Sequence, residues 1–136
     1  MTDMRKTILV IFIILCSAGC REYDIDEVLL QREDISLTVK GNEMLAYRPE
    51  SFQIGYNESI CEYRVFDDVL GNWFILRCQE RPSSEGQNVK ASLSWTTAND
   101  TKSKKGLSFR VEKTDSKGYI WLWCESEAIG IVVKEF

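Results

Sequence analysis

The sequence predicts an all-β domain: an antiparallel meander that forms a small β-sandwich or a lipocalin-like barrel of about eight short strands. Two observations predict this class. From Ile35 onward, apolar and polar residues alternate with a period of two, which is typical of strands that bury one face. Turn-forming residues also recur at short intervals, so consecutive strands are expected to pair as antiparallel neighbours.

The alternation marks three strands in the first part of the domain, at residues 35–39, 44–47 and 52–56. Turns are expected at residues 41–42, which are Gly-Asn, and at residues 57–59, which are Asn-Glu-Ser. Glycine and asparagine tolerate the backbone conformations that tight turns need. The chain should therefore reverse direction after the first and third of these strands.

A hairpin is predicted around the loop at residues 68–71, because one register satisfies both faces of its strands. Pairing residues whose numbers add up to 139 gives one apolar face, and gives the other face an ion pair and an aromatic pair. The pairs are Cys61–Cys78, Tyr63–Leu76 and Val65–Phe74 on one face, and Glu62–Arg77, Arg64–Ile75 and Phe66–Trp73 on the other. A shift by one residue would scramble both faces.

The second half of the domain continues the pattern. Residues 98–105 are polar and basic and are expected to form a long exposed loop, and residues 115–118 should turn the chain into a segment, YIWLWC, that is apolar on both faces and therefore central. The remaining strands are expected at residues 89–95, 107–111, 119–124 and 129–136.

The start of the chain has the pattern of a secretory signal peptide, at residues 1–19. Arg5 and Lys6 precede a nine-residue apolar run at residues 8–16, and small residues follow it. The run is too short for a membrane-spanning helix, which needs about 20 apolar residues.

Cys20 directly follows this segment, in the stretch Ala18-Gly19-Cys20. The stretch resembles the lipobox of bacterial lipoproteins, although Ser17 stands where that motif usually has leucine or another aliphatic residue. The resemblance implies cleavage before Cys20, a diacylglycerol on its thiol and an acyl chain, such as palmitate, on its new amine. Several acyl chains would anchor the protein firmly to a membrane, because one chain alone is marginal. The alternative is an ordinary cleavage that leaves an unlipidated thiol.

Three regions are expected: the signal peptide, a lipid anchor and acidic tether at residues 20–34, and an all-β domain at residues 35–136. The acid-rich tether resembles the surface-export signal of some Gram-negative lipoproteins, and its alternative is a solvated linker. We therefore expect an outer-membrane anchor, with the domain facing the periplasm or the cell surface. Segments 62–68 and 121–124 resemble small uncharacterised lipoproteins of Gram-negative anaerobes, which brings no established activity.

Composition argues against several classes of function. The chain has a formal net charge of −4, whereas a nucleic-acid-binding domain usually has a basic face, so no nucleic acid is expected as a partner. It contains no histidine, the commonest general base and metal ligand. No nucleophile-elbow, zinc-protease or phosphate-loop motif is present in the sequence. We expect no catalysis, no cofactor and no metal site.

The hairpin register places Cys61 opposite Cys78, and a disulfide between them is predicted because an exported protein meets an oxidising compartment. The alternative is buried reduced cysteines that act as small hydrophobic residues. Cys124 is predicted to lie in the core, because it alternates with Ile120 and Leu122.

Tyr119, Trp121 and Trp123 share one face of a single strand and are the candidate ligand-binding residues. In a meander barrel such a row either lines a ligand cavity or fills the interior. The lysine-rich segment at residues 101–105 either meets an anionic partner or is solvated.

These observations lead to two hypotheses about function. The first is a lipid-anchored, non-catalytic β-domain of the envelope or cell surface that makes protein or glycan contacts. The alternative is a lipocalin-like carrier that holds a small apolar ligand inside the barrel. The interior distinguishes them, because a carrier needs a cavity of about 300 Å³ or more.

Overall fold

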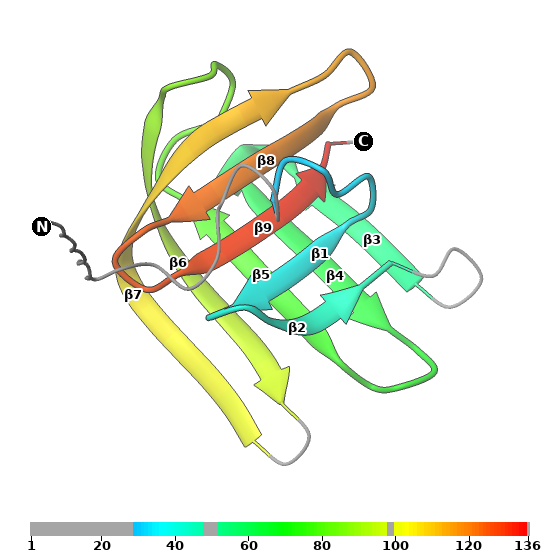
Figure 1. Cartoon of the computed structure of the whole chain (residues 1–136). Helices are drawn as coiled ribbons and strands as arrows, with labels where there is room; N and C mark the ends of the chain where they lie inside the picture. Colours follow the sequence, from blue (N-terminus) through cyan, green and yellow to red (C-terminus); the bar gives the residue numbers. More distant parts are fainter. Residues whose placement is uncertain (1–28, 48–51, 98–99, 136) are drawn as a thin grey trace, which may run out of the picture.

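The alternating segments pair into one antiparallel sheet of nine strands, which curls into a half-barrel (Figure 1). This computed structural model describes residues 29–47, 52–97 and 100–135. The predicted all-β class is confirmed, with nine strands instead of about eight. The strands are β1 (Ser36–Val39), β2 (Asn42–Ala46), β3 (Phe52–Asn57), β4 (Glu62–Asp67), β5 (Trp73–Cys78), β6 (Asn88–Thr97), β7 (Asp100–Thr114), β8 (Tyr119–Cys124) and β9 (Ile129–Lys134), with a 3₁₀ turn, η1 (Glu58–Ile60), between β3 and β4.

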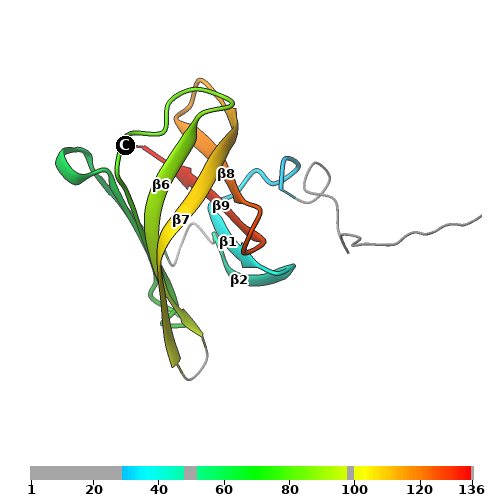
Figure 2. The same ribbon diagram turned by 90° about the vertical axis from the view of Figure 1, so that its left-hand side faces the viewer.

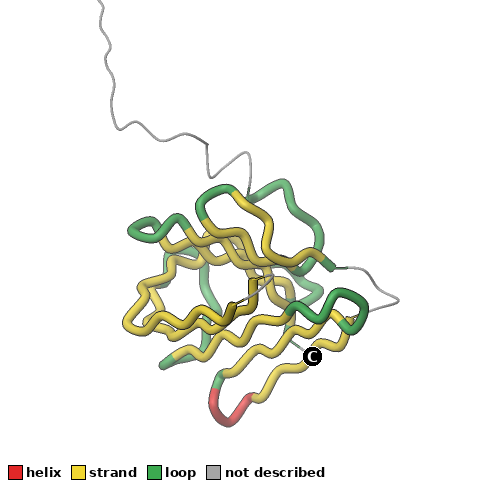
Figure 3. Tube along the Cα trace, turned by 90° about the horizontal axis from the view of Figure 1, so that it is seen from below, coloured by secondary structure: helices red, strands yellow, loops and turns green. Residues whose placement is uncertain are grey.

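Strands β3 to β9 follow one another across the sheet in sequence order, as a meander requires. β1 then pairs with β9, with Ser36 opposite Val132, and β2 pairs with β1, so that β2 and β3 form the two edges. The rings of Tyr47 and Phe52 meet edge-on with centroids 5.4 Å apart, which brings the connection after β2 close to the start of β3. The sheet is therefore curled but leaves two edges unpaired (Figure 3).

The hairpin of β4 and β5 has the predicted register. Glu62 pairs with Arg77, and the pairing continues without a shift to Phe66 and Trp73. The two aromatic rings lie 6.3 Å apart, as expected for cross-strand neighbours. The observed pairs confirm this register. A slip by one residue would have exchanged the apolar and polar faces of both strands.

The expected loop at residues 98–105 is wrong for residues 100–105, which belong to β7, and residues 100–104 pair with β6. Here β7 runs beyond the part that pairs with β8 and stays beside β6, which also pairs with β5 through Trp95 (Figure 2); we call residues 100–106 of β7 the arm. The β7 side chains at residues 100–106 are all exposed, so this part of the strand has no apolar alternation. A strand without a buried side lacks the signal from which strands are predicted.

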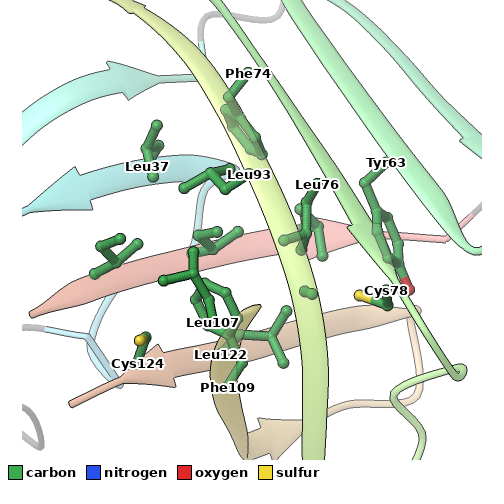
Figure 4. Close-up of a cluster of buried hydrophobic side chains, with 14 of the residues drawn as sticks. Leu37, Tyr63, Phe74, Leu76, Cys78, Leu93, Leu107, Phe109, Leu122 and Cys124 are labelled. Atoms are coloured by element: carbon green, nitrogen blue, oxygen red, sulfur yellow. The ribbon is translucent and has the colours of Figure 1, made fainter. Parts of the chain in front are cut away.

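The inner face of the sheet holds the main core (Figure 4). Leu37, Phe74, Leu93 and Leu122 are fully buried, although they come from four different strands. Cys124 is also fully buried, as predicted. Removing this apolar surface from water is the main force that holds the sheet in its curled shape.

A second, smaller cluster covers the outer face of β8 and β9. Residues 29–34, which we call the strap, cross this face, and Leu29 packs with Trp121, Trp123 and Val132. A Cβ at Gly130 would lie 3.1 Å from the Leu29 side chain, so the glycine gives this side chain room that a larger residue would reduce. The packed domain thus begins at least as early as Leu29, whereas a tether had been expected to run to residue 34.

A buried carboxylate joins β4 to β5. Glu62 is 1% exposed and accepts hydrogen bonds from Arg77, at 2.6 and 3.0 Å, and from Arg64. Burial alone would raise the pKa of Glu62, but the bonds and charges of the two arginines outweigh burial and lower it. A carboxyl whose pKa is lowered by folding stabilises the fold above its ordinary pKa and loses this contribution as the pH falls through the folded value.

We therefore expect Glu62→Gln to lower the free energy of unfolding by about 1–3 kcal/mol at pH 7, because two arginines lose their charged partner. The difference between the two proteins should narrow below about pH 4, where the carboxylate of the natural protein becomes protonated. Urea unfolding at pH 7, 5 and 3 measures both effects. Glu85→Gln, at an exposed loop position, is the control. A difference that stays constant with pH would contradict the assigned role.

The strap gives a second prediction. Leu29→Ala should lower the free energy of unfolding by about 2–3 kcal/mol, because it empties the contact with Trp123 and Gly130. Gln31→Ala, on an exposed residue of the same strap, should change it by less than about 0.5 kcal/mol. Equal stability of the Leu29 variant and the natural protein in urea unfolding would show that the strap does not pack on the sheet.

Candidate functional site

The three candidate aromatic residues lie on the outer face of β8, so both expected places inside the barrel, lining a cavity and filling the interior, are wrong. Trp121 and Trp123 belong to the cluster under the strap, while Ile120 and Leu122 point into the core between them. Tyr119 is half-buried at the start of β8 and contacts both clusters. The row therefore faces away from the half-barrel.

Neither tryptophan offers an open ring face for stacking. Trp123 is 5% exposed and packs in the same cluster as Leu29. Trp121 is 4% exposed, its Nε1 donates a hydrogen bond of 2.9 Å to the carbonyl oxygen of Arg32, and the Nζ atom of Lys113 lies 4.5 Å from its ring centroid. Both indoles hold the strap in place, and Trp121 also forms the floor of a groove.

This groove encloses about 440 Å³ on the outer face of the sheet. Its walls come from the strap, the end of β7, the turn between β7 and β8, and the end of β9. The residues that line it are Glu33, Lys113, Asp115, Lys117, Tyr119, Trp121 and Lys134. We call it the lysine groove. Its size is within the range of small-molecule sites in proteins.

Two cross-strand pairs build the lysine groove. Lys113 of β7 lies opposite Trp121, and Lys134 of β9 lies opposite Tyr119. The Nζ of Lys134 is 5.2 Å from the centroid of the Tyr119 ring, and the two aromatic rings are 6.1 Å apart. Each ammonium group is thus attracted to the face of a neighbouring ring, which holds two positive charges over adjacent aromatic residues.

A bulge in β7 brings Lys113 to this face. The regular alternation from Leu107 to Val111 would turn residue 113 toward the core. The pairing with β8 shifts between Val111 and Lys113, and Glu112 is the extra residue. The shift moves Lys113 beside Trp121, and a bulge that re-aims a side chain in this way is common near functional sites.

The two acids of the lysine groove differ in their roles. Asp115 Oδ1 accepts backbone hydrogen bonds from Lys117, at 3.0 Å, and from Tyr119, at 2.9 Å, so this carboxylate holds the turn between β7 and β8. Glu33 is exposed on the strap. Burial, followed by the charges of nearby groups that include Asp115, raises the pKa of Tyr119, so its hydroxyl stays protonated at neutral pH.

A smaller depression of about 240 Å³ lies beside the lysine groove and also includes Asp115 and Tyr119. At its wall, Arg81 donates two hydrogen bonds to Glu135, at 2.6 and 3.1 Å, and the Tyr63 hydroxyl donates to the same carboxylate at 3.1 Å. Burial raises the pKa of Tyr63 far above its ordinary value. These bonds tie the end of β9 to β4 and to the segment after β5, which is a structural role.

Cys61, Cys78 and Cys124 are free thiols in this structure, and the disulfide between Cys61 and Cys78 stays a prediction. The Cys78 amide donates to the Cys61 carbonyl oxygen at 3.0 Å, so the two residues are neighbours as the register requires. Cys61 has a left-handed backbone, with φ of 49°, which ends the regular ladder there. Burial, followed by the charge of Cys61, raises the pKa of Cys78 to about 12.

The other candidate residues are used within the fold. In the arm, Lys102 pairs with Asp100 at 3.3 Å, and Lys104 pairs with Glu127 at 3.2 Å. Within the part of the chain that the structure describes, no group of three potential metal ligands is found. Cys20 lies outside the described residues.

Comparison with family models, with curated proteins and with solved structures finds no match. Over residues 29–47, 52–97 and 100–135 there is no helix with the length and apolar character to cross a membrane. The geometry of the lysine groove is therefore the main guide to function.

The cysteines give a third prediction. In the reduced protein, iodoacetamide at pH 8 should modify half-buried Cys61 faster than Cys78, because buried Cys78 is almost entirely protonated at this pH. In the protein isolated without reductant, mass spectrometry should find one peptide pair that joins the two residues. Free thiols at both positions would refute the disulfide. Faster labelling of Cys78 would contradict its burial, and fully buried Cys124 is the internal control for slow labelling.

Proposed function

We propose that the protein is a lipid-anchored, non-catalytic domain of the cell envelope that contacts glycan or protein partners, with the lysine groove as its binding site. One observation carries the proposal: the lysine groove opens on the same outer face of the sheet that the strap crosses. The strap supplies Glu33 to the lysine groove and binds Trp121 through the carbonyl oxygen of Arg32. The segment that follows the anchor is thereby part of the binding site.

The position of the strap limits the distance between the anchor and the domain. Eight residues lie between Cys20 and Leu29 in the sequence, so the chain between them spans at most about 30 Å when fully extended. If Cys20 carries the lipid, the domain stays within that distance of the outer membrane. The lysine groove would then meet molecules of the envelope at high local concentration.

The chemistry of the lysine groove favours binding over catalysis. General acid–base chemistry requires a group that is placed to exchange protons with a substrate. Asp115 is occupied by two backbone amides of its own turn, and the second acid, Glu33, is exposed on the strap. The lysine groove offers ammonium groups and a protonated tyrosine, which are binding groups at neutral pH.

The interior favours surface contacts over the alternative of a lipocalin-like carrier. The core side chains on the inner face are 5% exposed or less and pack against one another (Figure 4). The two depressions described above include Tyr119, at the start of β8, and the larger lies on the outer face. A site on the outside suits a partner that is met at the surface.

The anchor gives a fourth prediction. Cys20→Ala should abolish labelling by palmitate and move the protein out of the membrane fraction, because no other cysteine follows the small residues of the lipobox-like stretch. Cys16→Ala, four residues earlier, should keep both properties and is the matched control. Unchanged membrane fractionation of the Cys20 variant would refute the anchor.

Cells that produce the natural protein can show which side of the outer membrane the domain faces. Protease added to intact cells should remove the domain if it is displayed on the surface. Full protection in intact cells, followed by digestion after the outer membrane is opened, would place it in the periplasm.

A further inference from the structure

We infer that the turn between β4 and β5 inserts into the surface of a lipid bilayer through Val69 and Leu70, which we call the apolar tip. This inference goes beyond the proposed function, because it concerns a second surface that does not include the lysine groove. It also does not require a lipid on Cys20. The partner is a bilayer of neutral phospholipid, and the contact would give the domain a defined orientation at the membrane.

The exposure of the apolar tip is the first observation. Val69 is 71% exposed and Leu70 is 56% exposed. Among the residues that the structure describes, only one other large apolar side chain, that of Ile60 at 43%, is exposed. The loop of a hairpin ordinarily carries glycine or polar residues, which suit its backbone. Two adjacent apolar side chains at this place gain no burial within the domain, so the fold alone does not explain them.

The turn holds the apolar tip in a fixed position. The Oδ1 atom of Asp67, a residue that is 3% exposed, accepts hydrogen bonds from the amides of Val69, at 3.0 Å, and Leu70, at 3.2 Å. The carbonyl oxygen of Asp67 accepts from the Gly71 amide at 2.8 Å, and its amide donates to the Asn72 carbonyl oxygen at 2.7 Å. Because these bonds order the turn before a partner arrives, little conformational entropy is lost on insertion.

An aromatic pair lies behind the apolar tip on the outer face of the hairpin. Phe66 and Trp73 are opposite each other, both are half-buried, and their ring centroids are 6.3 Å apart. Each lies three residues from the tip along its strand, which is about 10 Å. Tryptophan is typical of the boundary between hydrocarbon and head groups, because its ring is apolar and its N–H needs a polar partner. Insertion of the tip would place Trp73 at this boundary.

The charges of this face lie farther from the apolar tip. Arg64 and Arg77 are exposed, and both pair with the buried carboxylate of Glu62. Two positive charges and one negative charge leave a net charge of +1 in this group. Along the hairpin the order is therefore apolar, aromatic and charged, which is the order that a bilayer presents from its hydrocarbon to its head groups.

The shape of this end of the sheet favours a bilayer over a protein partner. The turn lies at the end of the β4–β5 hairpin, beyond the paired strands (Figure 1). A stable protein interface buries about 800 Å² on each partner, which is more than two side chains at the end of a turn provide. A bilayer accepts protruding apolar side chains without a complementary shape.

The acid of the turn indicates which kind of bilayer fits. Asp68 is exposed, and its carboxylate accepts a hydrogen bond of 2.9 Å from the Gln53 side chain. A negative charge beside the apolar tip is repelled by an anionic surface. Insertion should therefore depend on apolar burial in a neutral phospholipid surface and should need no anionic lipid.

The experiment uses the natural mature protein in phosphatidylcholine vesicles and measures quenching of tryptophan fluorescence. The quenchers are attached either to the lipid head group or deep in the acyl chains. Trp73 should be quenched, and more strongly by the shallow quencher than by the deep one. Quenching should persist in about 1 M salt, because burial of apolar groups is not screened. Trp73→Phe should remove the quenched signal, since the other tryptophans are 5% exposed or less: Trp95, Trp121 and Trp123.

Variants then locate the contact. Val69→Ser combined with Leu70→Ser should reduce quenching to the level of vesicles without quencher. The urea midpoint of this variant should equal that of the natural protein, because both side chains are exposed in the folded domain. Ile60→Ser is the matched control. It removes an exposed apolar side chain from η1, at the other end of β4, and should retain full quenching.

Three results would overturn the inference. They are absence of quenching in the natural protein, equal quenching in the double variant, and quenching that requires anionic lipid and disappears in salt. A photo-crosslinking amino acid at position 70 extends the test to cells, where it should attach to lipid. Crosslinks only to another protein would assign the apolar tip to a protein partner and would also overturn the inference.

The inference and the proposed function can fail separately. The anchor fails if the Cys20 variant keeps its membrane fractionation, whatever the apolar tip does. The inference fails if the tip does not enter the bilayer, even when Cys20 holds the protein at the membrane.

Discussion

Both faces of β8 are buried, so this strand needs cover on the outside of the sheet as well as on the inside. The core of the half-barrel covers Ile120 and Leu122, and the strap covers Trp121 and Trp123. Burying a large aromatic side chain is worth a few kcal/mol, and the strap can reach these rings because Gly130 leaves room for Leu29. The hydrogen bond from Trp121 to Arg32 satisfies an indole N–H that would otherwise be buried without a partner.

The lysine groove follows from this arrangement. The strap ends beside the start of β8, and the bulge at Glu112 turns Lys113 onto the same face. A lysine over a buried indole keeps its charge in water while its methylene groups cover the ring. The bulge in β7 thus places a charged lysine over the apolar outer face of β8, and this face becomes part of a polar groove.

The sequence was sufficient to predict those parts of the fold in which each residue can be assigned to the buried or to the exposed face of its strand. The β4–β5 hairpin could be predicted residue by residue, because both of its faces carry complementary pairs. The arm could not, because residues 100–106 have no buried side and no alternation. The face on which Trp121 lies was also undetermined, since YIWLWC is apolar in both directions and only the packing of the strap distinguishes them. Lys113 was missed as a site residue for a similar reason: its alternation with Val111 points inward, and the bulge that reverses it has no sequence signal of its own.

The strap also determines how the domain responds to mechanical load. A pull on the chain before Leu29 acts first on a short segment that lies on the surface of the sheet. The apolar side chains of Leu29 and Leu30, the indole hydrogen bond to Arg32 and the ion pair of Arg32 with Glu43 hold this segment. Such a segment detaches by peeling, contact by contact, at a lower force than would be needed to shear the paired strands. Because Glu33 lies on this segment and lines the lysine groove, tension along the chain and occupancy of the groove act on the same few contacts.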